Sequence, residues 1–430
     1  MTIERVASQA ERVAIVGGGI AGLAAAYLLS PYRSVTLFEA APRLGGHART
    51  VMAGLNGETA VDTGFIVFNY ANYPHLTRMF RDLDVPVERS DMSFGATIDN
   101  GRIEYGLATP AALISQRSNL LRPGFYRMVR DILRFNALAE SYEGDGTIGD
   151  LMDALSLGDW FQRYYLTPLC GAIWSTPTDE IRGFPARALV QFFRNHALLS
   201  TKGQHQWWTV SGGSVEYVRR LERHLTAQGC TLRPGTPVTS VARDDTGVTV
   251  KAGGESARFD QVIFACHADV ALRLLADPSD DERAMLGAMR FQDNRVILHR
   301  DPAQMPKRRG VWSSWVYKAS AAGDETEIGV TYWMNKLQNI PETDPLFVSL
   351  NPIQAVPDAL IYDEVTFRHP VFDAAALKAQ GQQRARQGQR RTWYAGAYTR
   401  HGFHEDGFAS AVRVARAMDL MPNLGIAHAA

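Results

Sequence analysis

Residues 13–50 read VAIVGGGIAGLAAAYLLSPYRSVTLFEAAPRLGGHART, and this stretch decides the fold. An apolar run of β type, 13–16, meets a glycine turn that leads into an alanine-rich segment. A second apolar run, 35–38, ends at Glu39. This order predicts a strand, a tight turn, a helix and a second strand, which is the βαβ unit of dinucleotide-binding folds. We therefore expect an α/β fold with a parallel sheet built on this unit.

The glycines of this turn follow the spacing G-x-G-x-x-G. The first glycine allows the turn, the second lets a diphosphate approach the backbone, and the third lets the helix pack on the strand. The helix N-terminus offers unpaired N–H groups to the diphosphate. Glu39 lies 22 residues after Gly17, where an acid accepts the hydroxyls of an adenosine ribose; an ordinary βαβ turn would not require it. The predicted contacts in this unit are Gly17, Gly19, Ile20, Ala21, Gly22, Glu39 and Ala40.

The residues that follow, R-x-G-G-x-x-R-T at 43–50, indicate which dinucleotide is bound. They resemble the glycine-pair motif of the FAD-dependent amine oxidase and phytoene desaturase superfamily, where a second glycine turn and its arginine run beside the flavin diphosphate. The resemblance implies FAD as the cofactor and a Rossmann-like FAD-binding domain with an inserted mixed α+β substrate domain. No cysteine near the C-terminus matches the flavin attachment site of some members, so we expect noncovalent FAD. The further contacts that the resemblance implies are Arg43, Gly45, Gly46, His47, Arg49, Thr63, Gly64 and Phe65.

The composition restricts the class of protein and its partners. The 430 residues carry 45 basic and 45 acidic side chains, so no net positive charge favours nucleic acid. The three cysteines lie far apart without metal-ligand spacing, which favours free thiols in a reducing cytoplasm. His401 and His404 have no evident third ligand, so we expect no metal.

The apolar run 13–29 is interrupted by its glycine turn, so we do not expect it to cross a membrane. We expect a cytoplasmic protein, at most peripheral on the inner membrane. Its oligomeric state stays open.

The chain divides into two domains, each built from separated segments. We assign 11–75, 205–275 and 391–430 to the FAD-binding domain, and 76–204 and 276–390 to the substrate domain.

The middle segment of the FAD-binding domain begins with a predicted helix, for which Ser214 is the candidate N-cap. Strands are then predicted at 236–242, 248–251 and 261–265, because apolar runs alternate with turn residues. The resemblance implies that Val238 lines the adenine and that residues 263–268 enter the cofactor pocket.

The C-terminal segment TWYAGAYTRHGFHEDGFASA, residues 392–411, predicts a buried strand followed by a helix that begins at Gly407. In the superfamily such a helix start directs backbone N–H groups at the flavin edge where negative charge gathers on hydride transfer. We carry this role to Gly407 and Phe408.

The same segment departs from the superfamily, in which an acid usually follows the Ala-Gly pair. Ala397 stands directly after Gly396, so either Glu405 or Asp406 takes over the role of that acid, or backbone groups do. The candidate catalytic residues of the segment are Phe408, Tyr398 and His404.

Nearly the whole chain resembles one bacterial branch of the superfamily, similar to the flavin-dependent desaturase of methylated fatty acyl chains in furan fatty acid biosynthesis. The shared pieces include VDTGFIVFNYANYP, WWTVSGGSVEYV and GFHEDG. The resemblance implies hydride removal from a C–H bond of a long apolar substrate, with a (methylated) fatty acyl chain of a lipid as the leading candidate. Oxygen or a quinone would reoxidise the flavin. The alternatives are a flavin amine oxidase and a non-catalytic flavoprotein partner of a lipid methyltransferase.

Two features bear on the substrate. Amine oxidases commonly place a lysine near flavin N5, and the corresponding segment 293–299 carries Asn294 or Arg295 instead, which counts against amine oxidation. Aromatic residues concentrate in segments that should line an apolar cavity, although core packing is the alternative explanation for each. These residues are Trp174, Trp207, Trp208, Trp312, Trp315, Tyr332, Trp333, Tyr398, Phe403 and Phe408.

One stretch, FYRMVRDILRFNAL at 125–138, concerns membranes. Its helical periodicity separates an apolar stripe from a basic one, with two more arginines upstream. The apolar stripe is Phe125, Met128, Val129, Ile132 and Phe135, and the arginines are Arg117, Arg122, Arg127, Arg130 and Arg134. Such a helix can lie on an anionic lipid surface; packing of the apolar stripe on its own domain is the alternative.

Overall fold

The βαβ unit predicted from the first glycine turn is present. The computed structural model of the chain describes residues 10–142, 144–174, 181–195, 199, 205–320 and 327–420. β1 (Arg12–Val16) leads into α1 (Ile20–Leu29) and β2 (Ser34–Phe38), and the two strands pair in parallel. β1 is apolar throughout its length after Arg12 because both of its faces are buried: Val13 and Ile15 face one core, and Ala14 and Val16 face another.

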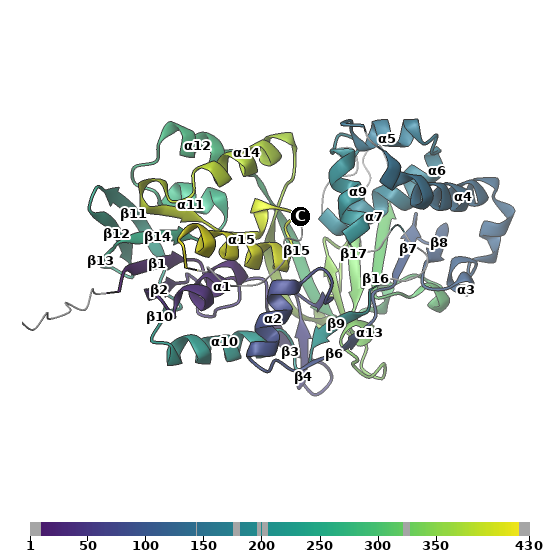
Figure 1. Ribbon diagram of the computed structural model, residues 1–430. Coiled ribbons are helices and arrows are strands. Elements are labelled where there is room, and N and C mark those ends of the chain that lie inside the picture. Colours follow the sequence, from purple (N-terminus) through teal and green to yellow (C-terminus); the bar gives the residue numbers. More distant parts are fainter. Residues whose placement is uncertain are drawn as a thin grey trace, which may run out of the picture.

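Three separated parts of the chain meet in one five-stranded parallel sheet, ordered β10-β2-β1-β14-β20 (Figure 1). Its other strands are β10 (Thr231–Arg233), β14 (Gln261–Phe264) and β20 (Thr392–Tyr394). One face packs with α1, α10 (Val215–Ala227) and α15 (His404–Ala417). This sheet, with helices packed on it, confirms the predicted α/β class.

The other face of this sheet is covered by an antiparallel sheet and by further helices. The elements are β11 (Val238–Asp244), β12 (Gly247–Ala252), β13 (Glu255–Phe259), α11 (Ala268–Leu274), α12 (Asp280–Gly287) and α14 (Ala374–Ala385). The sequence predicts β11, β12 and β14 to within two residues. It does not predict β10 or β13, because both are short and largely polar.

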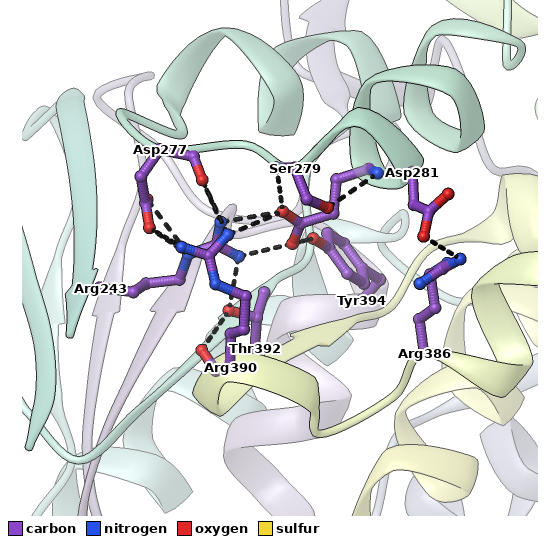
Figure 2. A network of polar contacts seen from close by, with 9 residues as sticks. Arg243, Asp277, Ser279, Asp281, Arg386, Arg390, Thr392 and Tyr394 are labelled. Carbon is purple, nitrogen blue, oxygen red and sulfur yellow. Dashed lines mark hydrogen bonds and ion pairs between the residues drawn. The ribbon is translucent and has the colours of Figure 1, made fainter. Parts of the chain in front are cut away.

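A buried network of charges joins β11 to α12 and β20 (Figure 2). The Arg243 guanidinium donates to both carboxylate oxygens of Glu282 at 2.6 and 2.9 Å, to Asp277 at 3.2 Å and to Thr392 Oγ1 at 3.1 Å. The Tyr394 hydroxyl donates to the same Glu282 carboxylate at 2.9 Å. The network therefore fastens the covering sheet and α12 to the edge strand of the parallel sheet.

The second large sheet has seven strands in the order β19-β15-β18-β17-β16-β7-β8. They are β7 (Phe94–Ile98), β8 (Ile103–Gly106), β15 (Phe291–His299), β16 (Trp315–Ser320), β17 (Glu327–Trp333), β18 (Phe347–Leu350) and β19 (Ile361–Pro370). The long strands β15 and β19 pair antiparallel, and Figure 1 shows β15 between the two halves of the molecule.

Helices cover one face of the seven-stranded sheet. The helices are α3 (Pro110–Leu113), α4 (Pro123–Leu138), α5 (Ile148–Ala154), α6 (Asp159–Phe161), α7 (Thr167–Trp174) and α9 (Ala186–Asn195), with a 3-10 turn, η1 (Arg117–Leu121), before α4. Across the described ranges, no helix combines the length and the apolarity needed to cross a bilayer.

Short elements lie between the two large sheets. They are β3 (Thr50–Ala53), β4 (Thr59–Asp62), β5 (Val67–Phe68), α2 (Pro74–Asp82), β6 (Val87–Ser90), β9 (Trp207–Val210) and α13 (Met334–Leu337). α2 begins at Pro74, because proline at the first helical position needs no backbone partner.

Candidate active site

The glycine turn between β1 and α1 is shaped by backbone packing. Gly17 has a φ of 113° and donates its N–H to Phe38 O at 2.8 Å; a Cβ there would lie 2.7 Å from Ala265 O. A Cβ on Gly22 would lie 1.8 Å from Gly17 O, so α1 could not pack this closely on the turn with any larger residue. The fold itself therefore requires both glycines.

Gly19 is different, because the fold leaves open space beside it. Its φ of −75° suits any residue, and the atom nearest to a Cβ built on it is Gly46 Cα at 4.0 Å. Glycine is thus required here only if another group comes against the backbone. A diphosphate is such a group, because it is drawn to the N–H groups at the helix start, where Ile20 and Ala21 lie.

The second glycine turn closes against the first. Gly45 donates its N–H to Gly18 O at 2.8 Å, and a Cβ on Gly46 would lie 3.0 Å from Gly19 Cα. The Arg43 guanidinium donates to Gly46 O at 2.9 Å and so braces this turn; burial lowers the pKa of Arg43. The two turns together form one cradle of partly buried backbone beside the start of α1.

Glu39 lies at the other end of this cradle. Its carboxylate accepts the Gly18 N–H at 2.6 Å and the Ala41 N–H at 2.8 Å, one on each oxygen. Each oxygen keeps a lone pair that can accept a ribose hydroxyl. Thr236 donates its N–H to Glu39 O at 2.8 Å, which brings the half-buried Val238 at the start of β11 next to this acid. The arrangement fits the adenosine end of a dinucleotide.

The turn after β4 runs beside the second glycine turn. Phe65 donates its N–H to His47 O at 2.9 Å, and Thr63 donates its N–H to Arg49 O at 2.8 Å. A Cβ on Gly64 would lie 2.1 Å from His47 O, so only glycine fits at this close approach. The structure therefore brings these five predicted contacts together.

Arg49 has a partner that the sequence does not predict. Its guanidinium donates to both oxygens of Asp363 on β19, at 2.6 and 2.9 Å, and to Thr63 Oγ1 at 3.2 Å. Arg49 thus ties the second glycine turn to the seven-stranded sheet, and its contact with a diphosphate stays a prediction.

Three neutral histidines lie where the glycine-pair turn meets the seven-stranded sheet. The His47 ring packs on Phe367 of β19 at 4.6 Å between centroids, and lies 5.6 Å from the His369 ring and 6.3 Å from the His267 ring. Burial lowers the pKa of His267 and of His369 to about 4 and that of His47 well below its ordinary value. His47 Nε2 is buried without a hydrogen-bond partner among the described residues, which marks it as a contact for a bound group.

Tyr398, one of the three catalytic candidates, extends this cluster. Phe291 of β15 stacks on the His267 ring at 4.2 Å and meets the Tyr398 ring edge-on at 6.0 Å. The Tyr398 hydroxyl is buried and has no partner within the described part of the chain. The geometry thus keeps Tyr398 as a candidate at the boundary of the two sheets.

The other two candidates, His404 and Phe408, are engaged in the core between α2, α10 and α15. His404 Nε2 shares a 2.6 Å hydrogen bond with the Tyr217 hydroxyl, and its ring stacks on Phe65 at 3.9 Å; burial lowers the pKa of His404 to about 3. Phe408 is buried in the same core, and its ring lies 6.1 Å from that of His75. Both residues pack in this core, and their catalytic role stays a prediction.

α15 begins at His404, three residues before the predicted start. The Asp406 carboxylate accepts the Phe403 N–H at 3.0 Å and caps the helix there. The Gly407 N–H already donates to Phe403 O, and a Cβ on Gly407 would lie 2.8 Å from Ile20 Cγ2. Gly407 therefore serves the packing of α15 on α1, and the free N–H groups belong to the residues before it.

The acid that follows the Ala-Gly pair in relatives has no carboxylate substitute here. Glu405 accepts the N–H groups of His75 and Leu76 at 2.9 and 3.0 Å and so caps α2; burial raises its pKa to about 8. Asp406 caps its own helix, and Gly396 donates its N–H to Ser410 Oγ at 2.8 Å. Because both carboxylates are engaged, the structure favours backbone groups at the start of α15 among the alternatives left open by the sequence, and the choice stays a prediction.

Asp62 lies at the centre of a buried hydrogen-bond cluster that the sequence does not predict. It accepts the Ser214 N–H at 2.8 Å, the Ser214 hydroxyl at 2.7 Å, the Thr50 hydroxyl at 2.6 Å and the Gln338 amide at 3.2 Å. Burial raises the pKa of Asp62 to about 6. Ser214 does begin α10, but its hydroxyl binds Asp62, and Thr50 Oγ1 accepts the Val215 N–H instead. The only signal in the sequence was a polar residue in each of the VDTG, SGGS and NKLQ pieces.

The aromatic residues predicted to line a cavity divide between the two faces of the seven-stranded sheet. The core under the helices includes Trp207, Trp315, Tyr332 and Phe403. Trp312 and Trp333 lie on the opposite face, where Arg309 covers both rings. Trp208 meets the Tyr70 ring edge-on, and the side chain of Trp174 lies outside the described residues. The first group therefore packs against the core that the helices cover.

Comparisons with known proteins agree with this site. A family model described as flavin containing amine oxidoreductase matches residues 20–299. A probable zeta-carotene desaturase of Synechococcus elongatus is 26% identical over 280 residues, which cover 58% of this chain and 56% of that protein. A carotenoid phi-ring synthase of Streptomyces griseus is 26% identical over 326 residues, covering 70% of this chain and 62% of that protein. The chain thus aligns with less than two thirds of either relative.

Solved structures share the fold. A CLA-producing fatty acid isomerase from P. acnes has a TM-score of 0.68 at 15% identity, covering 94% of this chain and 98% of its own. Cyclohexylamine oxidase from Brevibacterium oxydans has a TM-score of 0.69 at 15% identity, covering 95% and 100%. The cradle, the acid at its end and the family match agree on the cofactor, FAD. The chain belongs to the flavin-containing amine oxidoreductase family.

Proposed function

We propose that this protein is an FAD-dependent oxidoreductase that abstracts a hydride from a C–H bond of a long apolar substrate and leaves a double bond. A (methylated) fatty acyl chain of a lipid is the substrate we favour. We further propose that the FAD-binding and substrate domains follow the segments assigned from the sequence. Both relatives in the comparison carry carotenoid names, and carotenoids are long apolar molecules, which supports this substrate class.

The observation that carries the proposal is that the boundary between the two sheets holds neutral rings and that the described charged groups beside it are paired with one another. The rings of His47, His267 and His369 are neutral, and Phe291 and Phe367 pack among them. An ammonium substrate would need a carboxylate or a set of electron-rich rings to replace its water. An alkyl or polyene chain needs only apolar surface.

The charged groups near this boundary are already paired. Arg49 is bound to Asp363, and Arg368 is bound to Asp269 at 2.9 Å and to Asp293 at 3.2 Å. These ion pairs hold the glycine-pair turn and α11 against β15 and β19. Their charges are therefore not available to bind a cationic substrate.

The segment where amine oxidases carry a lysine also departs from that chemistry. Asn294 on β15 is fully buried, and its amide oxygen accepts from Asn351 at 2.8 Å. Arg295 is exposed and forms an ion pair with Glu364 at 2.7 Å. Neither side chain therefore offers a free ammonium group that could bind a water molecule, as a lysine would.

Bound FAD would supply the redox chemistry, since flavin accepts the hydride while the second hydrogen leaves the neighbouring carbon as a proton. The protein's residues would hold the diphosphate at the cradle, keep the ribose on Glu39 and exclude water with the buried rings of the boundary. Oxygen or a quinone would take the electrons afterwards, because the sequence holds a single dinucleotide fingerprint.

Expression in a bacterial host tests the proposed chemistry. When a methylated acyl precursor is present, lipids extracted from cells that express the protein should contain acyl chains with two hydrogens fewer than that precursor. Cells that express a Gly19→Val variant, which we expect to lack FAD, should not contain them. Identical lipid profiles in both strains, together with consumption of an added amine only by the wild-type strain, would contradict the proposal.

A further inference from the structure

Exposed apolar side chains gather at one end of the molecule. Of the eleven large hydrophobic residues that are exposed in the described structure, seven lie within residues 107–138. Leu121 is 85% exposed, Leu133 56% and Tyr126 55%. Figure 1 shows α3 and α4 at the end of the molecule opposite β1 and β13. A cluster of this kind on a folded domain marks an interaction surface.

α4 has two distinct faces. Phe125, Met128 and Phe135 are buried in the core under the seven-stranded sheet, so the apolar stripe predicted as a membrane contact packs on its own domain. The opposite face repeats at helical spacing and exposes Tyr126 and Leu133 among arginines. The surface available to a partner is therefore the face that the sequence presents as basic.

The charge of this surface has one sign. Residues 107–138 contain five arginines and one acid, Asp131. Asp131 is buried and accepts from Arg130 at 3.0 Å and from the Gly158 N–H at 3.0 Å. Arg117, Arg127 and Arg134 have no carboxylate partner among the described residues. The surface therefore presents uncompensated positive charge between its apolar side chains.

A recess of about 310 Å³ opens beside the arginines of α4. Arg127, Arg130 and the buried Asp131 line it from α4, and Arg163, Trp160, Ser156 and the exposed Asp159 line it from the segment that follows, so arginines outnumber acids in its lining. Guanidinium groups and a hydroxyl are donors suited to phosphate oxygens.

We propose that η1 and α4 form a docking surface for an anionic lipid bilayer. Leu121, Tyr126 and Leu133 would enter the headgroup region, and the arginines would contact lipid phosphates, with the recess as a headgroup site. A second copy of the chain is a poorer partner, because a two-fold contact of this surface would place arginines against arginines. The inference does not depend on the proposed reaction.

Vesicle sedimentation of the FAD-loaded protein tests the surface. We expect binding to vesicles that contain phosphatidylglycerol, weak binding to pure phosphatidylcholine, and loss of binding at high salt. Arg127→Gln with Arg134→Gln should weaken the binding by roughly thirtyfold, since each arginine near an anionic surface contributes about 1 kcal/mol. Leu121→Ser with Leu133→Ser should also weaken it, at every salt concentration.

Matched substitutions elsewhere serve as controls. Arg223→Gln with Arg283→Gln, on exposed positions of α10 and α12, and Leu55→Ser, on the turn after β3, should leave vesicle binding unchanged. A polarity-sensitive dye on Leu133→Cys should shift to the blue with anionic vesicles, and the same dye on Leu55→Cys should not.

Three results would overturn the proposal. The first is vesicle binding that does not change with lipid charge or salt. The second is vesicle binding that the control substitutions weaken to the same extent. The third is a wild-type protein that binds no vesicles and forms a dimer, which dissociates in the Leu121→Ser and Leu133→Ser variant.

Discussion

Replacing Gly19 with valine is expected to abolish FAD binding while the protein stays folded. The backbone at Gly19 is extended, and a Cβ there would have no atom closer than 4.0 Å, so the side chain enters space that the fold leaves free. That space lies between the two glycine turns, where the diphosphate approaches the backbone. We expect FAD affinity to fall by about a hundredfold or more, since overpacking of a fitted site costs roughly 3 kcal/mol. The flavin content of purified protein and its thermal unfolding measure the two effects.

Two other glycines give matched controls for this substitution. Gly22→Ala places a methyl group 1.8 Å from Gly17 O, so we expect loss of the fold itself and not of FAD alone. Gly381→Ala, inside α14, places its methyl group in open space, so FAD content should stay unchanged and stability should not fall, because alanine favours a helix more than glycine does. A Gly19→Val protein that keeps its flavin would show that the cradle does not hold the diphosphate.

Replacing Arg243 with methionine is expected to lower the free energy of unfolding by about 3–5 kcal/mol, because it leaves the buried Glu282 carboxylate without its main partner. The Arg243 side chain is 1% exposed and makes two hydrogen bonds to that carboxylate (Figure 2). Urea unfolding measures the loss. Arg258→Met is the control: its ion pair with Asp244 lies at the surface, so its removal should lower the stability far less than Arg243→Met does.

The same network predicts a dependence on pH. Burial tends to raise the pKa of Glu282, but the hydrogen bonds from Arg243, Ser279 and Tyr394 and the charge of Arg243 together outweigh it and lower the pKa to about 2. A lowered pKa contributes stability above the ordinary pKa of about 4.3, and that stability is lost as the pH falls toward 2. The difference in stability between wild type and Arg243→Met should therefore shrink as the pH is lowered from 5 to about 2. A difference that stays constant over this range would contradict the assignment.

The sequence predicts those elements of the structure that are determined by interactions between residues close together in the chain. The glycine spacing, the apolar runs and Glu39 specify β1, α1, β2 and the cradle, because turn geometry and burial act over a few residues. Pro74 likewise marks the start of α2.

The parts that it does not predict depend on contacts between distant residues. Arg49 turns to Asp363, and Asp62 joins Thr50, Ser214 and Gln338, through pairings that no local pattern encodes. The start of α15 is shifted because Asp406 caps the helix before Gly407. The basic face of α4 is visible in the sequence, but the direction in which its apolar stripe points is set by tertiary packing.

Flavin reduction under anaerobic conditions separates the proposed chemistry from amine oxidation most directly. The purified FAD-loaded protein is mixed, without oxygen, with phospholipids bearing methylated acyl chains, with a carotene, and with benzylamine or a polyamine. We predict that the oxidised flavin absorbance bleaches with a long apolar chain and does not respond to the amines. Rapid bleaching by an amine, with no response to any long-chain substrate, would contradict the proposal and identify an amine oxidase.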